Sequence, residues 1–200
     1  MAGYGLLLRD RRFMALAFMA SFTVSAFFVY VANSPFVMSA HYGVSPRQYA
    51  LLFALNAVSL LALSQANGWL VTRFGIRRVL RTAVMVQAGS IGLLLVLTLA
   101  GIDRLAVMVV LLMIGYGVNG LIVPATFVLA MEGHASLAGT ASALIGTMNF
   151  AGGALMVALV APFANGKPLP MVAGIAACAA VVFVLAMRSP GVRHPAAVAA

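Results

Sequence analysis

Six polar side chains inside long apolar runs are the residues of this sequence best suited to bind a ligand. They are asparagines and tyrosines, whose amide and hydroxyl groups can hydrogen-bond a neutral or polar molecule. They are Tyr30, Asn33, Asn56, Tyr116, Asn119 and Asn149. A polar group in hydrocarbon needs a partner, so each of them either faces a cavity or hydrogen-bonds a neighbouring helix. The sequence leaves both interpretations open for each residue.

Acid–base and metal chemistry lack suitable residues. The acidic residues Asp10, Asp103 and Glu132 all lie at the ends of apolar runs. No serine–histidine or aspartate pair lies within a run, which argues against hydrolysis inside a membrane. Glu132-x-His134 is too sparse to bind a metal ion. We therefore expect no enzyme, no metal site and no cofactor.

The composition predicts an integral membrane protein. Hydrophobic residues make up 64% of the chain and charged residues 8%, with a mean hydropathy of +1.11, whereas soluble domains contain about 25% charged residues. The net charge of +9 does not indicate nucleic acid, because no basic patch interleaved with aromatic residues occurs in a polar context. The expected partner of this apolar protein is therefore the lipid bilayer.

Six apolar segments are long enough to cross about 30 Å of hydrocarbon. The predicted spans are 13–40, 48–71, 79–101, 105–131, 137–163 and 171–187. They indicate an all-α membrane protein with a juxtamembrane segment at 1–12, a six-helix transmembrane bundle at 13–187 and a tail at 188–200. We expect Ser45 to cap the second span, with Pro46 at its first position. We also expect Pro35, which lacks a backbone donor, to break the end of the first span.

The basic residues predict the orientation of these spans. With six spans, both termini and the loop between the second and third spans lie on one side, and they carry nine of the twelve basic residues. Basic residues in short loops mark the cytoplasmic side of a membrane. The sequence therefore predicts a multi-pass protein of the inner (plasma) membrane of the cell with both termini in the cytoplasm.

The loop between the second and third spans carries the most specific motif. Residues 68–78 follow the pattern G-x-L-x-x-R-F-G-x-R-R. This pattern resembles the short cytoplasmic signature of the major facilitator superfamily, G-x-L-a-D-R-x-G-R-R/K, with Thr72 in place of the aspartate. The matching residues are Gly68, Leu70, Arg73, Gly75 and Arg77. The alternative is that this basic loop only fixes the orientation of the spans by remaining on the cytoplasmic side. In either case we expect changes at Arg73 or Gly75 to impair folding or gating rather than drug selectivity.

Four further stretches narrow the resemblance. Residues 30–38, 42–46, 51–57 and 139–143 resemble the second half of Bcr/CflA-type drug-resistance transporters. This resemblance implies the C-terminal six-helix half of a major facilitator fold, and efflux of drug-like small molecules such as bicyclomycin by proton antiport. It also implies that the first, second, fourth and fifth spans line a central cavity, where the six polar residues would bind substrate, and that the third and sixth spans are peripheral.

The expected partners follow from the two-half plan of that family. This sequence has one set of six spans and no acidic residue at mid-membrane to couple protons to transport. We therefore expect protons, a drug-like substrate and a complementary six-helix half as partners, with the coupling residue on that other half. The chain would then be truncated or dependent on its partner. Two alternatives of another class remain, an oligomeric passive channel and a non-transporting membrane scaffold or fragment, and the sequence identifies neither the substrate nor the oligomeric state.

Overall fold

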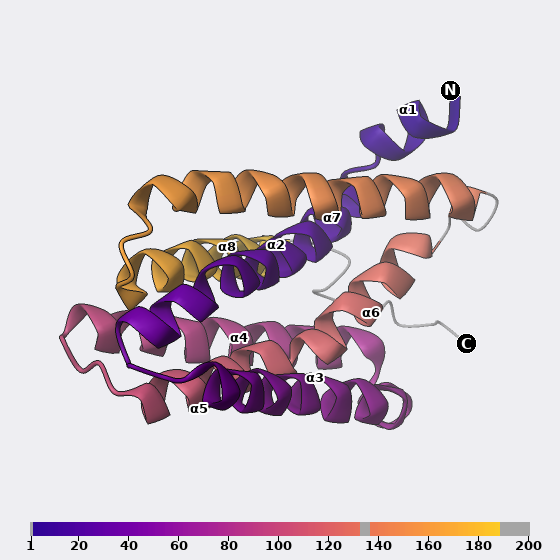
Figure 1. Ribbon diagram of the computed structural model, residues 1–200. Coiled ribbons are helices and arrows are strands. Elements are labelled where there is room, and N and C mark those ends of the chain that lie inside the picture. Colours follow the sequence, from indigo (N-terminus) through magenta and orange to yellow (C-terminus); the bar gives the residue numbers. More distant parts are fainter. Residues whose placement is uncertain (1, 133–136, 189–200) are drawn as a thin grey trace.

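The computed structural model describes residues 2–132 and 137–188, which are almost entirely helical (Figure 1). The elements are α1 (Ala2–Arg9), α2 (Arg11–Ala40), α3 (Pro46–Phe74), α4 (Ile76–Leu99), α5 (Leu105–Gly117), α6 (Asn119–Met131), α7 (Ala138–Val160), the short 3₁₀ helix η2 (Ala161–Phe163) and α8 (Pro168–Arg188). Six segments in this part of the chain are long and apolar enough to span a membrane: α2, α3, α4, α5 with α6, α7 with η2, and α8. The predicted all-α fold with six spans is confirmed.

The spans are helical because a helix pairs its own backbone groups, which hydrocarbon leaves without water as a partner. Polar side chains mark where the first two spans begin. The carboxylate of Asp10 accepts hydrogen bonds from the backbone N–H groups of Arg12 and Phe13, at 2.8 and 3.2 Å. Ser45 forms a reciprocal capping box with Gln48 at the start of α3, directly before Pro46. The predicted cap of the second span is therefore confirmed.

The expected break at Pro35 is wrong, because α2 continues through it to Ala40. A proline withholds a single backbone donor, and neighbouring groups in a membrane helix can compensate for that loss. The interruption lies in the fourth span instead, where Val118 separates α5 from α6. Gly117 precedes it and Pro124 follows within α6, and both residue types weaken a helix.

Helix α2 is the centre of the bundle. It packs against α6, α7 and α8, and Figure 1 shows it between α7 at the upper edge and α3 at the lower edge. In the most apolar window of each span, 56% of the residues are buried in α2, but only 6% in α3 and 17% in α7 with η2. Helices α3 and α7 are therefore the two flanks that the described chain leaves uncovered.

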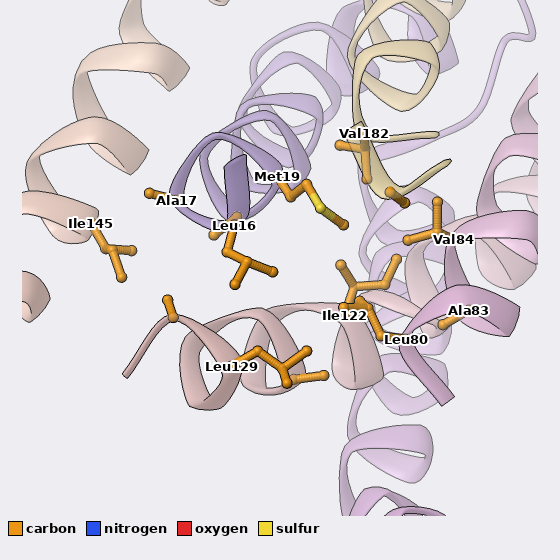
Figure 2. Close-up of a cluster of buried hydrophobic side chains, with 14 of the residues drawn as sticks. Leu16, Ala17, Met19, Leu80, Ala83, Val84, Ile122, Leu129, Ile145 and Val182 are labelled. Atoms are coloured by element: carbon orange, nitrogen blue, oxygen red, sulfur yellow. The ribbon is translucent and has the colours of Figure 1, made fainter. Parts of the chain in front are cut away.

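Two clusters of buried apolar side chains hold the helices together. The first joins Leu16 and Met19 of α2 to Leu80 of α4 and Ile122 of α6, as Figure 2 shows. The second lies toward the other end of the bundle and includes Val29, Tyr30, Leu112, Tyr116, Ile175 and Cys178. Because lipid tails are as apolar as these side chains, close van der Waals packing and interhelical hydrogen bonds stabilise the contacts.

Glycine allows α3 to lie directly against the fourth span. A Cβ atom on Gly120 would lie 2.6 Å from the carbonyl oxygen of Leu60 and 2.8 Å from the backbone nitrogen of Ser64. Helix α3 also bonds α5: the Oγ atom of Ser59 donates a hydrogen bond of 3.0 Å to the carbonyl oxygen of Met113. This contact fixes α3 relative to α5 and α6, and the three elements together carry three of the six polar residues considered next.

Candidate substrate-binding site

Three of the six polar residues meet where α2, α3 and α5 pack together. Nδ2 of Asn56 donates to the hydroxyl oxygen of Tyr30 at 3.3 Å. The ring centroids of Tyr30 and Tyr116 lie 4.9 Å apart, and the Tyr116 hydroxyl donates to the carbonyl oxygen of Ala26 at 2.8 Å. All three side chains are buried. The sequence brings one amide and two phenols from three helices to a single point.

These residues line a small cavity of about 80 Å³ with strongly aromatic walls. Phe53 stacks on Tyr30 with centroids 6.0 Å apart and rings nearly parallel, and Phe27 packs edge-on against Tyr116. Oδ1 of Asn56 is buried and has no hydrogen-bond partner within the described residues. A buried acceptor left unpaired costs about 1–3 kcal/mol, so Asn56 is the residue of this wall with unused hydrogen-bonding capacity.

A larger cavity of about 520 Å³ adjoins the small one, and Phe27 and Leu60 line both. Its wall comes from α2, α3 and α6 and is mostly apolar, with Thr23, Ser64 and Asn119 as its polar residues. No charged side chain lines either cavity among the residues that the structure describes. Together the two cavities have the size and character of a site for a small, largely apolar molecule.

A residue outside the cavity wall fixes the side chain of Asn119. Its Oδ1 accepts a hydrogen bond of 2.6 Å from Nε2 of Gln87 on α4, and both residues are buried. Asn119 is the first residue of α6, directly after the interruption at Val118. The pair therefore positions the start of α6 against α4.

The remaining two polar residues lie outside both cavities. Nδ2 of Asn33 donates to the carbonyl oxygen of Val29 in its own helix at 2.9 Å. Asn149 lies on α7, which contributes no residue to either cavity wall, and its Oδ1 is buried without a hydrogen-bond partner in the described chain. The structure thus groups Tyr30, Asn56, Tyr116 and Asn119 and places Asn33 and Asn149 elsewhere.

Sequence reasoning did not single out Phe27, Phe53 and Gln87. An aromatic residue in an apolar span carries no sequence signal that separates a cavity wall from a lipid-facing surface. Gln87 did carry a signal, because it is one of few polar residues in the third span. That span provides no cavity-lining residue here, but its Gln87 supports one that does.

The loop motif lies at what we call the basic end of the bundle, the end that carries the turn between α3 and α4. Gly75 makes that turn with φ of +82°, a conformation that favours glycine. Arg77 approaches Glu132, at the end of α6, at 3.8 Å, and Arg12, at the start of α2, forms an ion pair with the same carboxylate. The Thr72 hydroxyl donates to the carbonyl oxygen of Trp69 in its own helix. One carboxylate therefore joins the ends of three helices.

The other motif residues contact side chains of the bundle or lie in open space. The guanidinium of Arg73 lies 5.9 Å from the ring centroid of Trp69 and 5.8 Å from that of Phe74. Leu70 packs against the first core cluster. A Cβ atom on Gly68 would meet nothing within 4 Å.

The opposite end of the bundle has its own polar cluster. His41 and Tyr42, between α2 and α3, both contact the carboxylate of Asp103, between α4 and α5. Burial raises the pKa of the Tyr42 phenol above its usual value, and the hydrogen bond to Asp103 raises it further. This cluster ties two loops together at the end where α2 and α4 finish.

Comparison with known proteins agrees with this architecture. Residues 1–157 match the sequence pattern of the Major Facilitator Superfamily. The chain is 34% identical over 160 residues to an uncharacterized MFS-type transporter, YdgK, of Bacillus subtilis, covering 78% of this chain and 39% of that protein. It is 33% identical over 184 residues to a bicyclomycin resistance protein homolog of Haemophilus influenzae, covering 90% of this chain and 45% of that protein. The chain spans less than half the length of both relatives.

Proposed function

Because the chain belongs to the Major Facilitator Superfamily, and is thus a multi-pass membrane transport protein rather than an enzyme, we propose that it forms the C-terminal half of an exporter that releases drug-like small molecules in exchange for protons. The observation that carries this proposal is the buried Oδ1 of Asn56. Within the described residues it is an unpaired acceptor, and the aromatic wall to which Asn56 belongs continues into a larger apolar cavity. The similarity to a bicyclomycin resistance protein homolog supports a drug-like substrate.

The wall chemistry favours an uncharged ligand with at least one hydrogen-bond donor. Aromatic rings from Phe27, Tyr30 and Phe53 would contact its apolar part, and Asn56 would accept its N–H or O–H group. A charged substrate would lose its hydration without gaining a counter-ion from the described part of this wall.

The uncovered flanks support a complementary six-helix half as partner. Helix α3 exposes Leu51 at 65%, and α7 exposes Phe150 at 71% and Leu155 at 61%. These helices border the bundle on opposite sides of α2 (Figure 1). A second bundle packed along both flanks would close the larger cavity and make it a central one.

Proton coupling would come from that second bundle. The acidic residues of this chain are Asp10, Asp103 and Glu132, and all three lie at helix ends with polar or basic neighbours. A carboxylate that carries protons through a membrane is expected near mid-bilayer. The two bundles would then rock against each other to expose the cavity to either side in turn.

The positive charges support an orientation with the basic end in the cytoplasm. Arg73, Arg77, Arg78 and Arg81 all lie in or beside the turn between α3 and α4, and basic residues in short loops remain on the cytoplasmic side. Both termini would then be cytoplasmic in a protein of the inner membrane.

Transport by reconstituted vesicles tests this function. Vesicles would contain either this chain alone or this chain with a complementary half, and drug accumulation would be followed with an imposed pH gradient, with and without an uncoupler. We expect accumulation sensitive to the uncoupler only with both halves. Active accumulation with this chain alone contradicts the proposal, flux that is indifferent to the uncoupler favours a passive channel, and no flux in either preparation favours a scaffold.

A further inference from the structure

An apolar groove on the outside of the bundle lies between α3 and α4, with Val118 and Leu121 of α6 also in its wall, and shares no residue with either cavity. It has a volume of about 350 Å³. Leu63, Leu70 and Phe74 lie along one face of α3 and line it, whereas the larger cavity is lined from another face of that helix. On α4 its wall contains Arg78, its one charged residue among those described, together with Val79, Thr82, Ala83 and Val86.

The basic end of this groove carries the aromatic and basic side chains that are typical of the headgroup level of a membrane. Trp69 and Phe74 are 62% and 44% exposed there, and the guanidinium of Arg73 lies against both rings. Tryptophan side chains favour the boundary between hydrocarbon and water. From Arg78 to Val86 the groove extends about 12 Å along α4, and one leaflet of the hydrocarbon is about 15 Å thick. The groove is therefore long enough to hold most of a single acyl chain.

Two of the arginines at this end have no carboxylate partner within the described residues. Of the two acidic residues at the basic end, Asp10 caps α2 and Glu132 pairs with Arg12 and Arg77. The exposed guanidinium groups of Arg78 and Arg81 are left without a carboxylate partner among the described residues. An exposed positive charge at headgroup level above an apolar groove complements a phosphate joined to an acyl chain.

We propose that this groove is a binding site for an anionic phospholipid, with the phosphate at Arg78 and one acyl chain along Leu63, Leu70 and Val79. The site shares no lining residue with the cavities, and it requires that the complementary half proposed above leave this face of α3 and α4 open to lipid. A bilayer supplies such lipids continuously, so the groove would be occupied in the resting protein.

Trp69 provides a built-in reporter, because it is the single tryptophan of the chain and its ring centroid lies 6.3 Å from that of Phe74 in the groove wall. The protein, with any complementary half that copurifies, would be reconstituted in vesicles of phosphatidylcholine. Brominated phosphatidylglycerol or brominated phosphatidylcholine, with bromine near the ester end of the chain, would be added at equal fractions. We expect tryptophan quenching to show about a fivefold preference for the phosphatidylglycerol, the effect of one basic residue on an anionic lipid.

Two pairs of variants separate the groove from the general surface charge. Arg78→Gln should abolish the preference, whereas Arg81→Gln, which removes the same charge one turn away on α4 and outside the groove wall, should retain most of it. Thr82→Phe should fill the groove and reduce quenching by both lipids, whereas Met85→Phe, at an exposed α4 position outside the groove wall, should not.

Four outcomes overturn the site. Equal quenching by the two lipids in the wild type excludes phosphate recognition. Equal effects of Arg78→Gln and Arg81→Gln indicate attraction by the surface charge alone. Weak quenching by both lipids in the wild type means that protein covers the groove, and restoration of Trp69 fluorescence by a drug-like apolar compound means that the groove binds substrate instead of lipid.

Discussion

Gln87 of α4 donates a hydrogen bond of 2.6 Å to Asn119, the first residue of α6, and both side chains are buried. Replacing Gln87 by leucine leaves Asn119 Oδ1 without its donor in an apolar surrounding. We expect the free energy of unfolding in detergent to fall by about 1 kcal/mol, within the range found for hydrogen bonds between membrane helices. Thr98→Val is the control, because the Thr98 hydroxyl bonds only the carbonyl oxygen of Leu94 in its own helix. Equal losses in both variants would exclude a specific contribution from the interhelical bond.

Asn56 is the residue whose replacement should weaken substrate binding most directly. Asn56→Ala removes the unpaired acceptor and the donor to Tyr30. The loss of one hydrogen bond, about 1 kcal/mol, corresponds to an approximately fivefold higher Kd for the drug. Equilibrium binding of a labelled drug to the assembled transporter measures this change. Asn33→Ala should leave the Kd unchanged, because in the described part of the chain Asn33 bonds only its own helix. A larger rise in Kd for Asn33→Ala than for Asn56→Ala would place the site elsewhere.

Adding a side chain at Gly75 should lower the stability of the protein, in contrast to the same change at Gly68 in the same motif. Gly75 has φ of +82°, whereas Gly68 has no positive φ and open space around it. Gly75→Ala should therefore destabilise the protein by about 1–2 kcal/mol, and Gly68→Ala should be neutral or slightly stabilising, since alanine favours a helix. Thermal unfolding of the two variants measures the difference. A changed drug spectrum in a Gly75 variant that inserts and folds normally would argue against a purely structural role.

Gly120 is required for the crossing of α3 and α6. An added Cβ atom would meet backbone atoms of Leu60 and Ser64 at 2.6 and 2.8 Å, so the helices must move apart. Gly120→Ala should cost about 1–3 kcal/mol of stability, as overpacked cores do, and should also enlarge or distort the neighbouring cavity. Gly89→Ala is the matched control, because nothing lies within 4 Å of an added Cβ there. Similar stability of the two variants would show that this crossing is loose.

The contact between Tyr42 and Asp103 should make stability depend on alkaline pH. The pKa of the Tyr42 phenol is raised above its ordinary value of 10.0, first by burial and then by the hydrogen bond to Asp103. Because the folded pKa exceeds the unfolded one, the stabilisation is complete below pH 10 and is lost as the pH rises through the raised pKa. Unfolding of the wild type should thus show a steeper fall in stability above pH 10 than unfolding of Tyr42→Phe. Parallel curves would mean that the phenol ionises equally in both states.

The number and order of the spans could be predicted from the sequence, because bilayer thickness fixes the length of each apolar run. The cap at Ser45 was also predictable, since capping depends on residues close in sequence. The interruption of the fourth span was not, because it lies at Val118, which is not a helix-breaking residue type, whereas Pro35 and Pro124 both lie inside helices. Capping chemistry was therefore readable, whereas the position of a helix interruption was not.

The depth of a polar residue in the membrane is readable from the sequence, but its direction is not. Asn33 and Asn56 both lie inside apolar runs, yet one bonds its own helix and the other faces Tyr30 across a helix contact. Direction depends on the rotation of each helix about its axis, which neighbouring helices determine. For the same reason Gln87 could be recognised as unusual in its span, but not as the donor to Asn119.

The two most exposed spans, α3 and α7 with η2, are also the least apolar ones, although lipid favours contact with the most apolar helices. These flanks have the lowest hydropathy of the six spans, 1.6 for α3 and 1.8 for α7 with η2, whereas α8 and α5 with α6 reach 2.5 and 2.3 and are better covered. Lipid dissolves the most apolar helices best, so the isolated bundle presents its least lipid-soluble segments to the bilayer. A partner bundle packed along α3 and α7 would therefore replace lipid on the two least apolar spans, and its packing and hydrogen bonds there would supply the stabilisation.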